Sequence, residues 1–488
     1  MTGDAVPAPC ELSASEAKRL IEKGDLAPLE LLDSCIARIE ALNPVVNAIV
    51  ADNFERAREE ARAAGERAIK GRALGSLDGI PVGIEDTTDT EALRTTYGSR
   101  IYAQHVPDYD EHVVRALRDA GAIVVAKTNT AEFAAGGHTS NKVYGVTRNP
   151  FDPRRSCAGP SGGSAAALAT DMLALCTASD LSGSLAAPAA FCGVAALRPT
   201  PGVVPSDRRV VGMSTLGVQG PMARSVADLA LMLSAMGGAG GGDPLAGAAD
   251  AAGRGPPDLD GLRVAASVDL GYAEVDEQIG KVFRARVDAL APLFASLEWR
   301  DPDIRYSSHA FWYLSGMHAL AAHRDHFKHH YDALGMNVVT HYEAAMHMDP
   351  EQIGWAVAEQ TRIYRRFGAF FRDFDLLICP TTAVTPFPTE LPYCTHINGD
   401  PTDSYLQWID LTAGVSLTGH PVVQLPCGVD HTGMPLGIQL IGSRRYADRF
   451  LMDIAALLET HMQGVPALAR PVVDVGVLGE HASRLPPN

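Results

Sequence analysis

Residues 156–200 constrain the fold of this chain more than any other stretch, because they are dense in Gly, Ala and Ser and contain two short turns. The turns are Gly159-Pro160-Ser161-Gly162-Gly163-Ser164 and Asp180-Leu181-Ser182-Gly183-Ser184. The apolar segment between them, residues 165–175, has the composition of a buried helix. Backbone amides are therefore concentrated around Ser184, where successive N–H groups can form a nest for developing negative charge.

A serine inside such a nest can attack a carbonyl carbon, because the amides stabilise the oxyanion that forms. Ser184 is therefore the candidate nucleophile. The backbone of Leu181, Ser182, Gly183 and Ser184 is the candidate oxyanion site.

These residues resemble the amidase signature family, whose hallmark reads G-G-S-S-G-G-S, then a helix, then D-T-G-G-S and P-A-x-x-C-G. The similarity covers most of the chain, through Gly79-Ile80-Pro81-Val82-Gly83-Ile84, Lys127-Thr128-Asn129, Leu197-Arg198-Pro199-Thr200, Gly220-Pro221-Met222-Ala223-Arg224-Ser225-Val226, Pro380-Thr381-Thr382 and Gly433-Met434-Pro435-Leu436-Gly437. The resemblance implies an α/β fold with a large mixed central β-sheet covered by helices on both faces. It also implies an enzyme that acts on an amide or a related acyl substrate.

The chain departs from the family at two of the three positions to which the family's catalysis is attributed, namely a lysine, a serine in a cis peptide bond and the nucleophilic serine. Aligning Ile84-Glu85-Asp86 with the family's I-K-D puts Glu85 at the lysine position. The alignment of the first turn puts Pro160 at the cis-serine, so only Ser184 is retained. A third departure lies at Ala186, where family members often carry an arginine.

This chain cannot pass a proton through a second serine to a neutral lysine, because Pro160 has no hydroxyl group. Glu85 would have to serve as general base or acid, and a carboxylate is the weaker base unless burial raises its pKa. A water in the vacated space could bridge Glu85 to Ser184. We expect Glu85, Pro160 and Ser184 to converge on one cavity. The resemblance also implies that the Gly159-Pro160 bond is cis, because the family has a cis bond at this position and proline tolerates that isomer best.

Two functions follow from these departures. The first is an enzyme that runs amide, ester or related acyl chemistry with Ser184 as nucleophile and Glu85 in place of the lysine. The second is a catalytically inactive pseudoenzyme with a binding or scaffold role on the same fold. The ionisable side chain at Glu85 favours the enzyme, because an inactive site has no particular need of one.

The composition of the chain limits the kinds of binding partner that we expect. The chain has 488 residues, 46% of them hydrophobic, and a formal net charge of -17, which argues against a nucleic-acid or anionic-membrane partner. The opening MTGDAVPAPC lacks the features of a signal peptide, and no apolar run is long enough to span a membrane. We expect a cytoplasmic protein that acts on a small-molecule substrate without a cofactor or a metal. The sequence leaves open whether the protein forms a homodimer.

The chain divides into an N-terminal helical layer, residues 1–70, and an α/β domain, residues 71–480, with a helical insertion at about 307–371. The composition of residues 237–257 is that of a flexible linker. Strands are expected at 80–84, 123–125, 262–268, 374–379, 422–425 and 437–441, and further helices at 28–43, 53–70, 111–120, 226–236, 275–297 and 447–460.

Four other groups invite a catalytic or metal-binding role. Cys157 and Cys192 lie near the two turns, but neither has a neighbouring base in sequence. Lys127 matches a family lysine that is not the catalytic one, and His420 precedes a strand. The last group is the set of histidines in the insertion, of which His323, His326 and His330 would share one helix face. A structural role is the favoured interpretation for the cysteines, Lys127 and His420, and a solvated or pocket-lining helix is favoured for the histidines.

Overall fold

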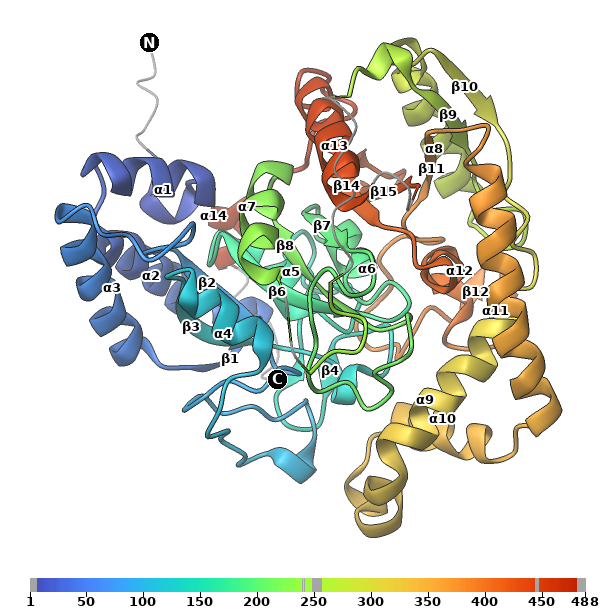
Figure 1. Ribbon diagram of the computed structural model, residues 1–488, viewed down its shortest axis with the longest axis horizontal. Coiled ribbons are helices and arrows are strands. Elements are labelled where there is room, and N and C mark those ends of the chain that lie inside the picture. The colour runs from blue at the N-terminus through green and yellow to red at the C-terminus, as the bar shows by residue number, and fades with distance from the viewer. Residues whose placement is uncertain (1–6, 239, 241, 248–256, 444–446, 481–488) are drawn as a thin grey trace.

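The molecule is organised around a mixed eleven-stranded β-sheet in the order β1-β3-β2-β6-β8-β7-β14-β15-β11-β9-β10 (Figure 1). The computed structural model describes residues 7–238, 240, 242–247, 257–443 and 447–480. β2 is parallel to β3 and β6, β9 is parallel to β10 and β11, and the remaining pairs are antiparallel. The strands are β1 Ile49–Asp52, β2 Pro81–Glu85, β3 Ile123–Thr128, β6 Leu175–Asp180, β7 Ala195–Arg198, β8 Val218–Ala223, β9 Arg263–Ala266, β10 Ser296–Trp299, β11 Leu376–Pro380, β14 Val422–Val429 and β15 Pro435–Gly442, beside the short β4 Ser140–Asn141, β5 Gly145–Val146, β12 His396–Ile397 and β13 Asp400–Pro401.

Helices cover both faces of this sheet, as predicted. Neighbouring residues of a strand point to opposite faces, and Val124 belongs to one buried cluster whereas Ile123 and Val125 belong to another. The first cluster takes residues from α1, α4, α7, α8 and α13, and the second from α3, α5, α6 and α14, while α2 contributes to both. The helices are α1 Ala14–Lys23, α2 Pro28–Val46, α3 Phe54–Ile69, α4 His112–Asp119, α5 Gly162–Ala169, α6 Ala186–Phe191, α7 Val226–Met236, α8 Glu277–Leu290, α9 Ser307–His329, α10 Met336–Met346, α11 Pro350–Phe370, α12 Asp410–Thr418, α13 Ala447–Gln463 and α14 Val475–Glu480.

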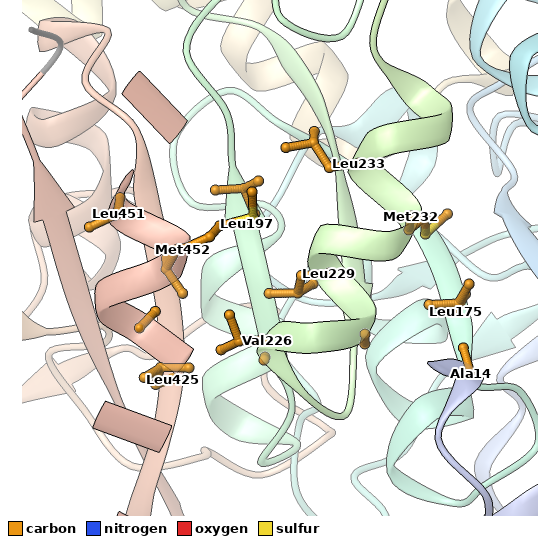
Figure 2. Close-up of a cluster of buried hydrophobic side chains, with 14 of the residues drawn as sticks. Ala14, Leu175, Leu197, Val226, Leu229, Met232, Leu233, Leu425, Leu451 and Met452 are labelled. Carbon is orange, nitrogen blue, oxygen red and sulfur yellow. The ribbon is translucent and has the colours of Figure 1, made fainter. Parts of the chain in front are cut away.

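The core under α7 shows how the central strands are held. Figure 2 shows apolar side chains of α7 in one cluster with Leu175 of β6, Leu197 of β7 and Leu425 of β14. Each of these leucines is at most 1% exposed, and burying such a side chain contributes about 1.5–3 kcal/mol. β6, which leads into the turn with Ser184, is therefore fixed within a packed layer.

Two predicted helices are wrong in part. Helix α5 ends at Ala169, and Leu175 begins strand β6, where the sequence predicts one helix through residues 165–175. A strand buried on both faces carries no alternation that separates it from a buried helix. The predicted helix 275–297 likewise ends at Leu290 and is followed by strand β10.

The N-terminal segment is not purely helical, because β1 pairs with β3 at the edge of the sheet. Strands β7 and β8 were also not predicted from the sequence. In the region of the expected insertion, α9, α10 and α11 project beyond the sheet in Figure 1. Residues 239, 241 and 248–256 of the predicted linker lie outside the described residues. In the described ranges, none of the helices combines the length and apolarity that a membrane-spanning segment needs.

Candidate active site

A cavity of about 590 Å³ is lined by the turn that carries Ser184, by Pro160 and by residues of α9. This volume lies in the range of sites for small molecules. Pro160 and Ser184 share the cavity as predicted, but Glu85 does not line it. The side chain of Glu85 is only 1% exposed and lies behind the wall, so the predicted convergence of all three is wrong for this residue.

The turn after β6 is shaped by the buried carboxylate of Asp180. It accepts hydrogen bonds from the amide of Gly183 at 2.9 Å and from that of Leu185 at 3.2 Å. It also forms a buried ion pair with Arg198 at 2.8 Å. Gly183 has a φ of 104°, and a Cβ atom there would lie 2.1 Å from Thr412 Oγ1. Only glycine fits this position without displacing its neighbours.

The candidate oxyanion site has fewer available amides than the sequence suggests, because the Gly183 amide already donates to Asp180. The amides of Leu181, Ser182 and Ser184 have no hydrogen-bond partner among the described residues, and all three residues line the cavity. The Ser184 hydroxyl likewise has no hydrogen-bond partner within the described part of the chain, and the residue is 7% exposed. A substrate carbonyl in the cavity can thus meet both a hydroxyl and unpaired amides.

Glu85 ends β2 and is surrounded by donors. Its Oε1 atom accepts hydrogen bonds from Ser161 Oγ at 2.8 Å and from Thr130 Oγ1 at 3.2 Å. Its Oε2 atom accepts from the backbone amide of Ser179 at 2.7 Å. Burial raises the pKa of Glu85 above its usual value, and these hydrogen bonds oppose that rise. Three donors around one carboxyl group suit its ionised form.

Ser161 links Glu85 to the turn, a role that sequence reasoning missed. Its hydroxyl lies 2.8 Å from Glu85 Oε1 and 3.4 Å from the carbonyl oxygen of Ser179. Its amide donates to the carbonyl of Ser184 at 3.3 Å. The signal was present in the sequence, since Ser161 directly follows Pro160 within the hallmark motif.

The peptide bond between Gly159 and Pro160 is cis, which confirms the prediction. Thr139 holds this turn from the side. Its hydroxyl lies 2.8 Å from the Ala158 carbonyl oxygen and 2.9 Å from that of Pro160, and it accepts from the Gly162 amide at 2.9 Å.

The alternative nucleophiles and bases lie outside the cavity lining. Cys157 and Cys192 are buried, and burial raises the pKa of Cys157 to about 12. Lys127 donates to Thr90 Oγ1 at 3.1 Å and to the Thr88 carbonyl, and burial lowers its pKa to about 8. It therefore holds the loop after β2. His420 packs against the rings of Phe367 and Phe371, at 4.9 and 5.4 Å.

The histidines of α9 form part of the cavity wall. His323 and His326 line it, with their Nδ1 atoms 3.4 Å apart, whereas His330 is exposed. Among the residues that the structure describes, no group of three or more His, Cys, Asp or Glu side chains is placed to hold a metal ion.

Known proteins resemble this chain over most of its length. The amidase family model matches residues 30–451. One of the subunits of the glutamyl-tRNA(Gln) amidotransferase of Chloroflexus aurantiacus is 34% identical over an alignment of 486 positions, gaps included, that covers 93% of this chain and 98% of that protein. Among solved structures, a bacterial aryl acylamidase superposes with a TM-score of 0.84 at 24% identity, covering 97% of this chain and 99% of the other. A 6-aminohexanoate cyclic dimer hydrolase superposes with a TM-score of 0.82 at 25% identity, covering 96% and 99%. The chain therefore belongs to the amidase signature family, whose members are enzymes of the type that hydrolyses carbon–nitrogen bonds.

Proposed function

We propose that this enzyme cleaves an amide or related acyl substrate with Ser184 as nucleophile and Glu85 as general base, although the family's lysine and cis-serine are absent. The observation that supports this most is the short contact between Glu85 and Ser161, because the amide of Ser161 bonds to the backbone of Ser184. Ser161 thus contacts both the ionisable group of Glu85 and the backbone of the candidate nucleophile Ser184.

In the acylation step the Ser184 oxygen forms a bond to the acyl carbon. Its proton passes through one bridging water and the Ser161 hydroxyl to Glu85. The oxyanion is stabilised by the unpaired amides of the turn, Leu181, Ser182 and Ser184. The bond from the acyl carbon to the leaving nitrogen or oxygen then breaks, and the proton from Glu85 returns to the leaving group. Water hydrolyses the acyl-enzyme by the same route.

Ser161 is suited to carry this proton in both directions. With Glu85 ionised, its hydroxyl donates to Oε1 at 2.8 Å. With Glu85 protonated, the hydroxyl can accept from Glu85 and donate to the Ser179 carbonyl oxygen, which is 3.4 Å away. Pro160 contributes no proton to this route, since its side chain carries no hydroxyl.

The test is covalent labelling combined with turnover. Wild-type protein is treated with a fluorophosphonate and screened for hydrolysis of amides and esters, beside Ser184→Ala, Glu85→Gln and Ser161→Ala. We expect Ser184→Ala to lose the label and at least about 10³-fold in kcat. We expect Glu85→Gln to lose about 10²- to 10⁴-fold. The control Ser234→Ala changes an exposed serine of α7 and should behave as wild type.

The outcomes separate three cases. A label on Ser184 with turnover that depends on Glu85 supports the proposal. Unchanged turnover in Ser184→Ala, with no label on the wild type, favours a water activated by Glu85 instead. Neither label nor turnover across the screen favours the pseudoenzyme.

A further inference from the structure

One part of the cavity wall is aromatic. Tyr97, Tyr102, Phe133 and His326 line the cavity, and we call these four side chains the aromatic wall. The ring centroids of Tyr97 and Tyr102 are 5.0 Å apart, and those of Phe133 and His326 are 4.8 Å apart and stacked. Phe133 also lies 6.2 Å from Tyr97 and 6.1 Å from Tyr102. The four rings therefore form one continuous surface, drawn from three separate segments of the chain.

Two of these residues hold an unfavourable backbone conformation. Tyr97 has a φ of 53° and Phe133 a φ of 50°, in the left-handed region that bulky side chains rarely adopt. The two residues are joined directly, since the amide of Phe133 donates to the carbonyl of Tyr97 at 2.7 Å. Strain of this kind persists only where the surrounding structure enforces it, and it gathers at functional sites. The fold thus keeps both rings at the cavity against their backbone preference.

The rings are also fixed before any ligand arrives. The Tyr97 hydroxyl donates to Asp89 at 2.5 Å, and the Tyr102 hydroxyl lies 3.0 Å from His326 Nε2. Burial lowers the pKa of His326 below its usual value, which favours the uncharged ring. A ligand at this wall therefore meets neutral rings whose polar atoms already have partners, and little side-chain freedom is lost on binding.

We propose that the aromatic wall binds a flat, uncharged aromatic group of the substrate. This inference rests on the proposed function in one respect: the aromatic group would belong to the acyl or leaving part of the molecule that Ser184 attacks. Ring faces and edges attract a second ring through their quadrupoles, which a saturated ring of similar size cannot match. The substrate class is thus an aryl or arylalkyl amide or ester.

The test measures binding without turnover, so that it does not depend on the catalytic proposal. In the Ser184→Ala background, dissociation constants of phenylacetamide and cyclohexylacetamide are measured by ligand-observed NMR titration. We expect phenylacetamide to bind about 2- to 12-fold more tightly, the range that an aromatic pair contributes beyond buried area. Adding Tyr102→Leu or Phe133→Leu should bring the ratio of the cyclohexylacetamide to the phenylacetamide dissociation constant close to one. Tyr102→Phe, which keeps the ring, should retain it.

Phe327→Leu is the matched control, because Phe327 lies on α9, stacks on Tyr342 at 4.3 Å and does not line the cavity. It should leave the ratio unchanged. If Phe133→Leu fails to fold, Tyr102→Leu carries the test, since Tyr102 has no positive φ. Equal or tighter binding of cyclohexylacetamide in the parent overturns the inference, as does a ratio that survives the loss of the Tyr102 ring. Absence of turnover in the wild-type protein would count against the proposed function and not against this site.

Discussion

At the scale of single residues, Glu85 balances two opposing effects. Complete burial favours the neutral carboxyl, whereas donors from Ser161, Thr130 and Ser179 favour the carboxylate. Because burial is the larger effect, the pKa lies above its usual value of 4.5, which makes Glu85 a stronger base than an exposed glutamate. Burial thereby offsets part of the loss of the neutral lysine.

The pH dependence of turnover tests this balance. A base must be ionised to act, so we expect kcat to rise with pH through a midpoint above 4.5. Ser161→Ala removes a hydrogen bond that lowers the pKa, so its kinetic midpoint should move to higher pH, in addition to a fall in kcat. The measurement is a pH–kcat profile of both proteins. A midpoint that stays in place or moves to lower pH would show that Ser161 does not contact the base during turnover.

At the scale of elements, the turn after β6 depends on a glycine. Gly183→Ala adds a methyl group 2.1 Å from Thr412 Oγ1 at a φ of 104°. Gly24 directly follows α1 with a φ of 78°, and a Cβ atom there would meet no atom within 4 Å beyond its neighbours in the chain, so Gly24→Ala carries the backbone cost alone. We expect Gly24→Ala to lose about 1 kcal/mol in the free energy of unfolding and Gly183→Ala clearly more, with loss of turnover only in the latter. Urea denaturation and kinetic assays measure both. Equal losses would mean that the turn moves freely around Thr412.

Helix α1 is anchored at its N-terminus by a carboxylate from α7. The buried Asp228 accepts from the amides of Ala14 and Ser15, at 3.0 and 2.9 Å, and from the Ser15 hydroxyl at 2.7 Å. We expect Asp228→Ala to lower the free energy of unfolding by about 2–4 kcal/mol, because it leaves buried donors unpaired. Relative to wild type, amide hydrogen exchange in Asp228→Ala should become faster in α1, and by more than it does in β6. The control Asp453→Ala, at an exposed position of α13, should change neither quantity. Uniform destabilisation without local exchange would argue against the anchor.

At the scale of the whole molecule, burial acts on acids and histidines in opposite directions. It raises the pKa of Glu111, Asp410 and Glu459 to about 7, and it lowers the pKa of His323 and His341 to about 4. The folded protein binds protons on these acids that the unfolded chain has released, so their contribution to stability falls as pH rises from about 4 to 7. The histidines contribute less as pH falls from 6.5 to about 4, because the unfolded chain then binds more protons.

Two variants should therefore show opposite pH trends in unfolding temperature relative to wild type. The unfolding temperature of Glu459→Gln minus that of wild type should rise as pH increases from about 4 to 7, since the variant carries no buried charge there. The difference for His341→Gln should rise as pH decreases from 6.5 to 4. The control Glu277→Gln changes an acid whose side chain is 75% exposed and should show no trend. Scanning fluorimetry across pH provides the measurement, and parallel curves for all the variants would contradict this account.

The local sequence was sufficient for several features of this protein. The alternation of sheet and helix and the turn with Ser184 follow from residues adjacent in the chain, where glycine permits conformations that other residues avoid. The cis bond before Pro160 was predicted from the resemblance to the family, which has a cis bond at this position, together with the tolerance of proline for that isomer. Strand β6 was missed because an apolar run buried on both faces has the same composition as a buried helix.

Tertiary structure decided the chemistry around Glu85 and the character of the cavity. Glu85 bonds to Ser161 and Ser179, which are 76 and 94 residues away in the chain, so no local pattern could reveal that the carboxyl lies behind the wall. The same holds for the aromatic wall, because its rings come from two loops and from α9 and meet only in the folded chain. Sequence motifs identify the residues that form a tight turn and the candidate nucleophile. The pKa of a side chain and the recognition of a substrate depend on neighbours that only the folded chain brings together.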